Sequence, residues 1–418
     1  MSQPTAAASS PSTSPSADPD LSSRGVHFAI LGAGPTGLEA ALAAAENGYE
    51  FTLYEASDRV AGHVHGWRHV RLFTPWSMNM SDRMRRALRE AGSPVPDEEA
   101  FPTGQDLIEQ LYEPLAESPA LAGRLRLATR VTSIGRQGLL KHEEIASDAR
   151  GQRPFRLLVE DSAGAESLES ADLVLDCTGN TEPNSLGDAG IPAPGERGVG
   201  DRIVRDLPNL DDEAESWAGT TTLLVGGGHS AQTALRDLVH LAEEHPGTRL
   251  VWAMRSAAPR PQEDDPLPER QRLTIFAAGI AESPPDFVDV RSHSVIDGLR
   301  ETDGGRLEIT LRSGHDFSSV EVDRVLSMTG RVGDHQLYRQ LQVHECYATS
   351  GPMKLAAALL STSGASGDCL AQTSLGPESL RSPEPGFFIL GSKSYGRRTD
   401  FLMKVGWQQV DEIFQLLD

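Results

Sequence analysis

Three glycines are the residues of this 418-residue chain whose spacing has the clearest chemical meaning. Gly32, Gly34 and Gly37 form the pattern G-x-G-x-x-G directly after the apolar run Val26–Leu31. Glycine at these positions permits a tight turn, close approach of the backbone to a diphosphate, and close packing of helix on strand. The N-terminus of the helix that follows adds free N–H groups and a partial positive charge. The pattern therefore predicts a dinucleotide site.

An acidic residue strengthens this prediction. Glu55 ends the second strand expected in the stretch Val26–Glu55, where a carboxylate can accept hydrogen bonds from both hydroxyls of a ribose. Strand, loop, helix, second strand and terminal acid together are much more specific than three glycines alone. The alternative is an ordinary glycine-rich turn between a strand and a helix.

A second loop of the same kind follows the expected strand Thr221–Val225. The segment Gly226–Ala231 reads GGGHSA, with Ala231 in place of the third glycine, which the motif tolerates because that position governs helix packing. The next strand ends in Arg255 and not in an acid. A guanidinium favours a 2′-phosphate, so the second site is predicted to select NADPH. The alternative is a salt-bridged surface arginine without a role in selection.

The composition limits the possible partners. A net charge of −22 and a pI near 4.9 argue against nucleic acid or an anionic membrane as a partner, since either requires a basic face, and a cytoplasmic protein acting on a small molecule is expected. Residues 1–24 are rich in Ser, Pro, Ala and Thr and read as a disordered leader. Three cysteines without C-x-x-C spacing predict neither a metal site nor a disulfide scaffold. Cys346 and Cys369 are expected to be structural thiols, and a redox pair is the alternative.

The elements that position these loops predict an α/β fold with two Rossmann-like dinucleotide-binding domains. Two apolar strands that end in Thr178-Gly179 and in Thr329-Gly330 bracket the second loop, so the second domain should be inserted into a discontinuous first domain. The expected division is leader 1–24, first domain 25–215 and 325–418, and second domain 216–324. Residues 103–117 have leucines at helical spacing and predict an amphipathic helix.

The residues after Glu55 resemble a known family. Arg59, Gly62 and Trp67 follow the acid in the manner of flavin-containing monooxygenases, and Asn79-Met80-Ser81 matches an Asn-x-Ser that lies near the flavin in that group. The resemblance implies that the first site binds FAD and that NADPH reduces it. It also implies oxygenation of a small nucleophile through a C4a-(hydro)peroxyflavin, with Asn79 contacting that species and His65 a weaker candidate for proton transfer.

The resemblance also implies cofactor contacts further along the chain. Val131 corresponds to a residue that presents backbone groups to adenine, and Gly391-Ser392 to the closing element of the FAD domain, where the family often has Asp in place of Ser392. Lys393 is a candidate for the flavin N1–C2=O edge, with an exposed loop lysine as the alternative. The FAD contacts expected are Gly32, Gly34, Pro35, Thr36, Gly37, Glu55, Arg59, Gly62, Trp67, Val131, Thr178, Gly179, Gly391 and Ser392. Those expected at the second loop and the return crossing are Gly226, Gly228, His229, Ser230, Ala231, Arg255, Thr329 and Gly330.

Two further functions stay open at this stage. The F-x-G-x-x-x-H-x-x-x-[YF] fingerprint of mainstream flavin monooxygenases does not lie between the two loops. An FAD-dependent NAD(P)H reductase of a small acceptor or a protein is therefore the alternative, and a non-catalytic nucleotide sensor is a minor one. Substrate and oligomeric state cannot be derived from these residues.

Overall fold

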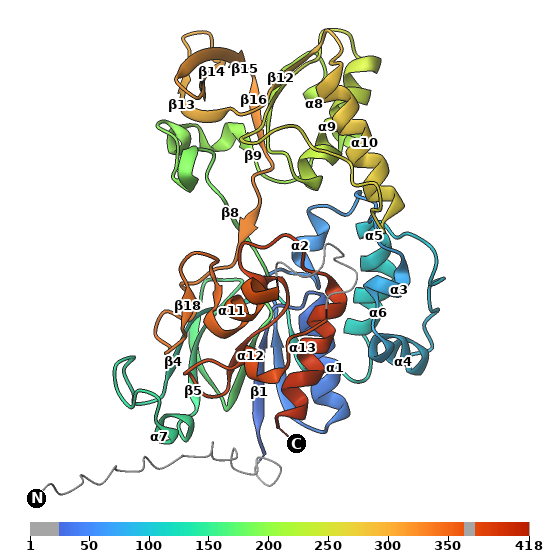
Figure 1. Cartoon of the computed structure of the whole chain (residues 1–418). Coiled ribbons are helices and arrows are strands. Elements are labelled where there is room, and N and C mark those ends of the chain that lie inside the picture. The colour runs from blue at the N-terminus through green and yellow to red at the C-terminus, as the bar shows by residue number, and fades with distance from the viewer. Residues whose placement is uncertain (1–24, 363–372, 418) are drawn as a thin grey trace, which may run out of the picture.

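The computed structural model describes residues 25–362 and 373–417 of the chain. The predicted leader and Cys369 lie outside this part. Within it, two bodies of similar design are joined by a narrow connection (Figure 1).

The first body is built on a five-stranded sheet in the order β20-β7-β1-β2-β3, with all neighbours parallel. Its strands are β1 His27–Leu31, β2 Glu50–Tyr54, β3 Leu125–Arg126, β7 Leu173–Asp176 and β20 Phe387–Ile389. The predicted location of the C-terminal strand in this first sheet is confirmed, because Phe387 pairs with Val174.

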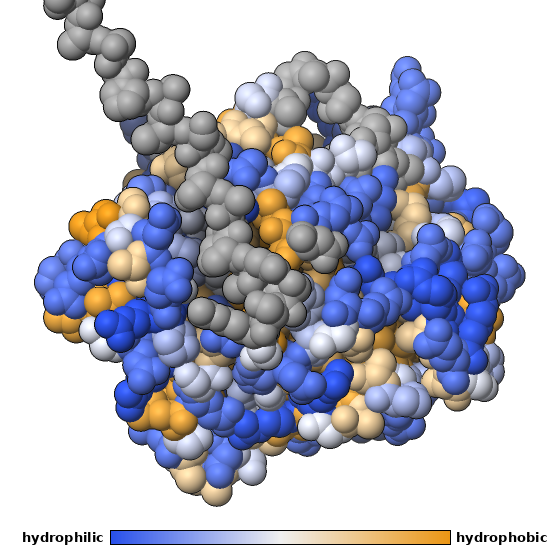
Figure 2. Space-filling model, turned by 90° about the horizontal axis from the view of Figure 1, so that it is seen from below, coloured by the Kyte–Doolittle hydropathy of each residue, from blue (hydrophilic) through white to orange (hydrophobic). Residues whose placement is uncertain are grey.

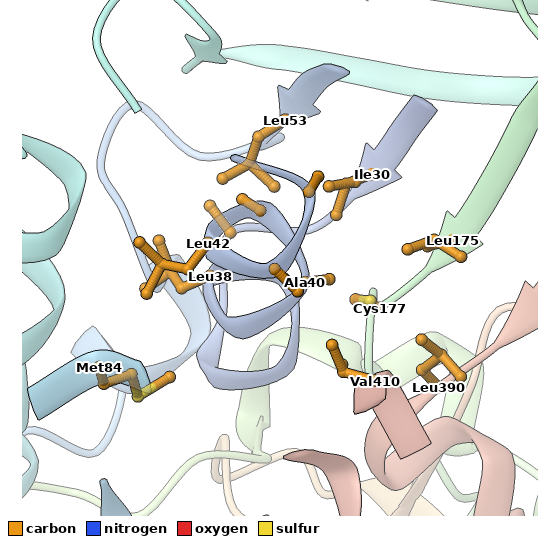
Figure 3. Packing of buried hydrophobic residues seen from close by; sticks show 14 of the residues in the cluster. Ile30, Leu38, Ala40, Leu42, Leu53, Met84, Leu175, Cys177, Leu390 and Val410 are labelled. Carbon is orange, nitrogen blue, oxygen red and sulfur yellow. The ribbon is translucent and has the colours of Figure 1, made fainter. Parts of the chain in front are cut away.

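Alternating side chains bury both faces of this sheet. On one face Ile30, Leu53 and Leu175 pack against helix α1 (Pro35–Glu46), as Figure 3 shows, and α13 (Met403–Gln415) joins the same core. On the other face a three-stranded antiparallel sheet covers the core, with strands β4 Thr129–Arg136, β5 Phe155–Asp161 and β6 Glu166–Ala171. Such two-sided burial is typical of parallel sheets.

The second body repeats this architecture. Its parallel sheet has the order β12-β11-β10-β16-β9, with strands β9 Ile203–Val204, β10 Thr221–Val225, β11 Arg249–Ala253, β12 Val288–Arg291 and β16 Arg324–Ser327. Helices α8 (Leu210–Trp217), α9 (His229–Glu244) and α10 (Pro268–Glu282) share a core with one face. An antiparallel sheet of β13 Val295–Glu301, β14 Leu307–Ser313 and β15 Asp316–Val322 covers the other. The predicted class, two Rossmann-like α/β domains, is thus confirmed.

The chain crosses between the bodies at β8 (Glu182–Pro183) and β17 (Arg331–Val332), which pair antiparallel (Figure 1). The boundaries expected at 215 and 325 are wrong in detail. Strand β9 already belongs to the second sheet, and Val325 and Leu326 of β16 are fully buried beside β10. Apolar strands that end in Thr-Gly look alike in both sheets, so their sequence does not show to which sheet each belongs.

Short helices and hairpins complete the molecule. They are α2 Gly62–His65, α3 Trp76–Asn79, α4 Asp82–Glu90, α7 Asp148–Gly151, η3 Asp188–Gly190, η4 Glu196–Arg202, β18 Glu345–Cys346, β19 Gly351–Pro352, α11 Met353–Thr362, α12 Pro377–Leu380 and η6 Gly391–Tyr395. The helix predicted over 103–117 forms as α5 Gly104–Leu107, η2 Ile108–Tyr112 and α6 Glu113–Ala116, where η2 is a π turn. Pro114 explains this π turn, because its ring cannot follow a regular α-helical turn.

One face of the molecule is largely polar. Figure 2 shows a face on which hydrophilic residues predominate and hydrophobic ones lie in scattered groups. No helix within the described ranges is long and apolar enough to cross a membrane.

Candidate functional site

The first glycine loop has the geometry of a phosphate cradle. Gly32 has φ of +91°, and a Cβ on it would lie 2.9 Å from the carbonyl oxygen of Cys177. A Cβ on Gly37 would lie 1.8 Å from the carbonyl oxygen of Gly32, so both positions require glycine. A Cβ on Gly34 would meet nothing within 4 Å. Gly34 caps α1 without a side-chain hydrogen bond, and Pro35 begins the helix, so the open side of this loop fits a phosphate.

Glu55 lies immediately after β2, beside this loop. Its carboxylate accepts hydrogen bonds from the N–H groups of Ala33 (2.8 Å) and Ser57 (2.9 Å), and burial raises the pKa of Glu55 above its usual value. Gly62 is required here, because a Cβ on it would lie 2.4 Å from the Cβ of Ser57. Each carboxylate oxygen keeps a second lone pair that a ribose hydroxyl could use.

Of two other predicted FAD contacts, Val131 borders the Glu55 site and Arg59 faces solvent. Val131 lies on β4, whose first residue Thr129 donates its N–H to the carbonyl oxygen of Glu55 (2.8 Å), so the predicted adenine edge borders the site. Arg59 is exposed and forms an ion pair with exposed Asp58 at 3.0 Å, which turns its charge toward solvent. The positive charge that acts on the Glu55 carboxyl is that of Arg130, a residue that no motif indicated.

The ends of β7 and β20 complete the first site. A Cβ on Gly391, which has φ of +72°, would lie 2.7 Å from Oγ1 of Thr36, so the closing loop contacts the glycine loop. Asn180 Nδ2 donates to the carbonyl oxygen of Ser392 (3.3 Å), and Oδ1 of Asn180 is buried without a partner among the described residues. The structure therefore brings together the predicted residues Thr36, Thr178, Gly179, Gly391 and Ser392. The residues present fit a dinucleotide, and the unpartnered Asn180 oxygen points to a missing hydrogen-bond donor.

The proposed catalytic role of Asn79 does not agree with its surroundings. Asn79 is 2 % exposed, and its Nδ2 donates to the carbonyl oxygens of Thr74 and Pro75, both at 2.8 Å. Ser81, the other half of the Asn-x-Ser match, caps α4 by accepting the N–H of Met84. These residues shape the chain between α3 and α4, and the amide of Asn79 has no free N–H group for a ligand.

The other residues expected near the flavin are placed as follows. His65 ends α2, and its Nε2 is buried without a partner in the described part of the chain. Burial and the nearby Arg59 lower the pKa of His65, which favours the neutral ring that a proton acceptor needs. Trp67 packs against the backbone of α5. A Cβ on Gly104, the first residue of α5, would lie 2.9 Å from the indole ring of Trp67. The indole thus supports the helix over 104–116.

Lys393 is neither exposed nor free to face a flavin. Its Nζ lies 2.6 Å from Oδ2 of Asp176 and 3.1 Å from Oγ1 of Thr178, and it is 1 % exposed. Both expectations for Lys393, the flavin edge and the exposed loop, are therefore corrected. Its type and position in the sequence could not reveal the buried aspartate, since Asp176 looks like the end of an ordinary apolar strand.

The second glycine loop repeats the first. A Cβ on Gly226 would lie 2.4 Å from the carbonyl oxygen of Met328, whereas a Cβ on Gly228, which caps α9, would meet nothing within 4 Å. Ala231 is fully buried, as expected for the packing position, and Ser230 is exposed. No motif in the sequence indicates a role for Gln232 at this loop. Its Nε2 donates a hydrogen bond to the carbonyl oxygen of Gly227 (3.0 Å) and stiffens the loop.

The position that matches Glu55 in the second body is Met254. Gly32 donates its N–H to the carbonyl oxygen of Tyr54, and Gly226 donates its N–H to the carbonyl oxygen of Ala253. The residues that follow these two acceptors, Glu55 and Met254, therefore correspond. Arg255 is one residue further along and is exposed, with no ion-pair partner among the described residues. The absence of an acid at Met254 and the exposed Arg255 leave this loop open to a phosphate.

Thr329 and Gly330 lie at the crossing, directly after Met328, whose carbonyl oxygen borders Gly226 of the second glycine loop. Oγ1 of Thr329 donates to the carbonyl oxygen of Asn184 (3.2 Å), and Asn184 Nδ2 donates back to the carbonyl oxygen of Thr329 (3.1 Å). Gly330 accepts the N–H of Asn184 (3.0 Å). These two residues therefore hold the two connecting segments together, and their contact with a cofactor stays a prediction.

A pocket of about 380 Å³ lies where the two bodies meet. Its walls come from the second glycine loop, α9, α10, the proline-rich loop between β11 and α10, and the segment before α13. The lining residues are Gly227, His229, Gln232, Pro259, Arg260, Gln262, Asp265, Arg270, Thr274, Thr399, Asp400, Phe401 and Leu402. Asp265 pairs with Arg270 (2.6 Å), and this pairing lowers the pKa of Asp265. His229 also packs edge-on against Phe73 of the first body, with ring centroids 5.9 Å apart. No motif in the sequence indicates that residues 399–402 contribute to this pocket.

Comparisons with known proteins agree with this architecture. Residues 30–84 match the family of NAD(P)-binding Rossmann-like domains. No curated protein matches the chain by sequence. Among solved structures, the bacillithiol disulfide reductase of Bacillus cereus is similar with a TM-score of 0.69 at 16% identity, covering 94% of this chain and 98% of its own. The cadaverine monooxygenase of Erwinia amylovora is also similar, with a TM-score of 0.63 at 14% identity over 93% of this chain and 94% of the monooxygenase. The ornithine hydroxylase of Pseudomonas aeruginosa has a TM-score of 0.62 at 16% identity over 94% of this chain and 100% of the hydroxylase.

These similarities define a class of fold. The chain has the fold of the two-domain FAD- and NAD(P)-dependent oxidoreductases of the Rossmann type. The matched region spans the first glycine loop, and because FAD and NAD(P) share an adenosine diphosphate half, this motif alone does not separate the two ligands.

Proposed function

We propose that this protein is an oxidoreductase that binds FAD at the first glycine loop and NADPH at the second. The observation that carries the proposal is the presence, in one chain, of two open phosphate cradles that differ in the residues after the second strand. These residues are Glu55 beside the first loop, and Met254 with Arg255 beside the second loop. A carboxylate suits the free ribose of FAD, and an exposed guanidinium suits a 2′-phosphate. Flavin supplies the redox chemistry when it is bound.

The chain's own groups have more limited tasks. Gly34 and α1 hold a diphosphate, Glu55 orients a ribose, and the neutral Nε2 of His65 is able to accept a proton. The pocket between the bodies, with its mixed charges, holds the substrate or the coenzyme next to the second glycine loop. We propose oxygen insertion into a small nucleophilic N, S or carbonyl compound as the reaction, in keeping with two structural neighbours, a cadaverine monooxygenase and an ornithine hydroxylase.

The alternative is an FAD-dependent reductase, which the first neighbour supports. A dithiol relay is disfavoured by the cysteines that the structure describes. Cys177 is buried below the first loop, and burial raises its pKa well above the usual value, whereas Cys346 is half-buried in the hairpin of β18 and β19. A reductase of this chain would therefore pass electrons from flavin directly to its acceptor.

Three measurements test the proposal. Purified protein should be yellow and should release FAD on denaturation; a colourless protein that takes up no added FAD would refute the cofactor assignment. NADPH should bleach the bound flavin without oxygen. In air, a panel of small amines, thiols and ketones should then increase NADPH consumption while hydrogen peroxide release falls, because one oxygen atom of each O₂ is inserted into the substrate and the other leaves as water. Reduction of quinones or dyes without any coupled substrate would instead establish the reductase.

A further inference from the structure

Lys393 and Asp176 form a buried ion pair at the first site, and the proposed function gives this pair no role. Their side chains are 1 % and 0 % exposed, and Nζ and Oδ2 lie 2.6 Å apart. Lys393 belongs to η6, the turn after β20, and Asp176 is the last residue of β7. The pair therefore joins the two strand ends that border the dinucleotide cradle.

Asp176 in turn shapes the backbone below the glycine loop. Besides Lys393, its carboxylate accepts hydrogen bonds from Oγ1 of Thr178 (2.7 Å) and from the N–H of Thr178 (3.2 Å). A Cβ on Gly32 would lie 3.1 Å from the Cα of Thr178, so these two segments touch. The conformation that Asp176 imposes on Thr178 thus reaches the first glycine of the cradle directly.

The side chain of Lys393 is enclosed by its neighbours and has no other position for its ammonium group. Its Nζ lies 5.0 Å from the ring centroid of Tyr338, and a Cβ on Gly333 would lie 2.5 Å from its Cγ. Because the chain is enclosed on these sides, the ammonium is fixed at Asp176. A carboxylate buried at this depth is tolerated only while its positive partner stays in place.

We propose that Lys393 is a positioning residue for the diphosphate of the bound dinucleotide. Its ammonium neutralises Asp176, so the two phosphates bind above Thr178 without an uncompensated negative charge below them. Lys393 acts through Asp176 and does not touch the ligand. This inference rests on the proposed binding of FAD at the first site.

The test compares FAD affinity in three variants of the full chain, Lys393→Met, Asp176→Asn and the double variant, by fluorescence titration of the apoproteins. Lys393→Met should weaken FAD binding about 100-fold, since a like charge then faces the phosphates. Asp176→Asn should weaken it less than about 10-fold, because it weakens only the hydrogen bonds that Asp176 accepts from Thr178 and leaves no negative charge below the phosphates. The double variant should bind within about 10-fold of the parent, since neither unpaired charge remains.

A matched control is the buried cluster of one carboxylate and two arginines just before β20. Glu384 accepts hydrogen bonds from Arg136 (2.6 Å) and Arg150 (2.9 Å) and is 1 % exposed. Glu384→Gln should lower the Tm of the apoprotein and leave the Kd for FAD unchanged. If Lys393→Met does not fold, Lys393→Gln replaces it, since it is also uncharged.

The outcomes separate the two proposals. A parent protein that binds no FAD refutes the proposed function. If the parent binds FAD but both single variants lose the same affinity and the double variant recovers none, the pair serves the fold alone and this inference is overturned. Unequal losses with recovery in the double variant support it.

Discussion

Arg255 is the residue on which coenzyme choice depends. A charge-assisted hydrogen bond contributes roughly 1.5–3 kcal/mol, which corresponds to a preference of about 10- to 150-fold. Arg255→Ala should therefore lower kcat/KM for NADPH by about that factor and leave NADH nearly unchanged, in steady-state assays with both coenzymes. Arg300, an exposed arginine of β13 that pairs with Glu308, provides the control variant Arg300→Ala. Equal kcat/KM for NADH and NADPH in the parent would show that Arg255 selects nothing.

Asn79 is expected to matter for stability and not for oxygen chemistry. Its amide satisfies two partly buried carbonyl groups, and leaving a fully buried group of this kind unpaired costs about 1–3 kcal/mol. Asn79→Ala should lower the free energy of unfolding by about that amount in a denaturant titration, whereas Ser77→Ala, on the exposed side of α3, should not. An Asn79→Ala variant with parental stability that releases more hydrogen peroxide would restore the catalytic interpretation.

At the scale of the element, the first strand, loop and helix show what a sequence can predict. Gly32, Gly37 and Gly34 have separate tasks that the motif already distinguishes, and the structure confirms the strand and helix around them. What the sequence could not show depends on distant partners. Asp176 and Lys393 are far apart in the chain, and Asn79 is identified as structural only by its hydrogen bonds with Thr74 and Pro75.

This division of tasks within one loop makes a prediction. Gly34 faces open space with φ of −81°, so Gly34→Val should fold and lose FAD, because the added side chain occupies the diphosphate position. Gly37→Ala should instead fail to fold or lose much of its stability, since its Cβ would collide with the backbone of Gly32. Circular dichroism and flavin absorbance measured on both variants check this. A yellow Gly34→Val protein would contradict the location of the site.

At the scale of the whole molecule, two similar bodies must hold their loops in a fixed relation for electrons to pass between ligands. The connections at β8 and β17 consist of two residues each, so contacts elsewhere must fix the angle between the bodies. One such contact is that of Phe73, before α3, with His229, the first residue of α9. Because His229 also lines the pocket, this contact ties the geometry of the pocket to the relative placement of the bodies.

The Phe73–His229 contact should therefore control the rate of flavin reduction. An aromatic pair of this kind contributes about 0.5–1.5 kcal/mol, so Phe73→Ala should slow anaerobic reduction of the flavin by NADPH by up to about 10-fold. FAD content should stay unchanged, because the ring contact of Phe73 is with His229 of the second body. Phe317→Ala, which removes an exposed aromatic ring on β15, is the control. If stopped-flow traces of the two variants are the same, the bodies are aligned by other contacts, and the segment 399–402 at the pocket wall becomes the next place to substitute.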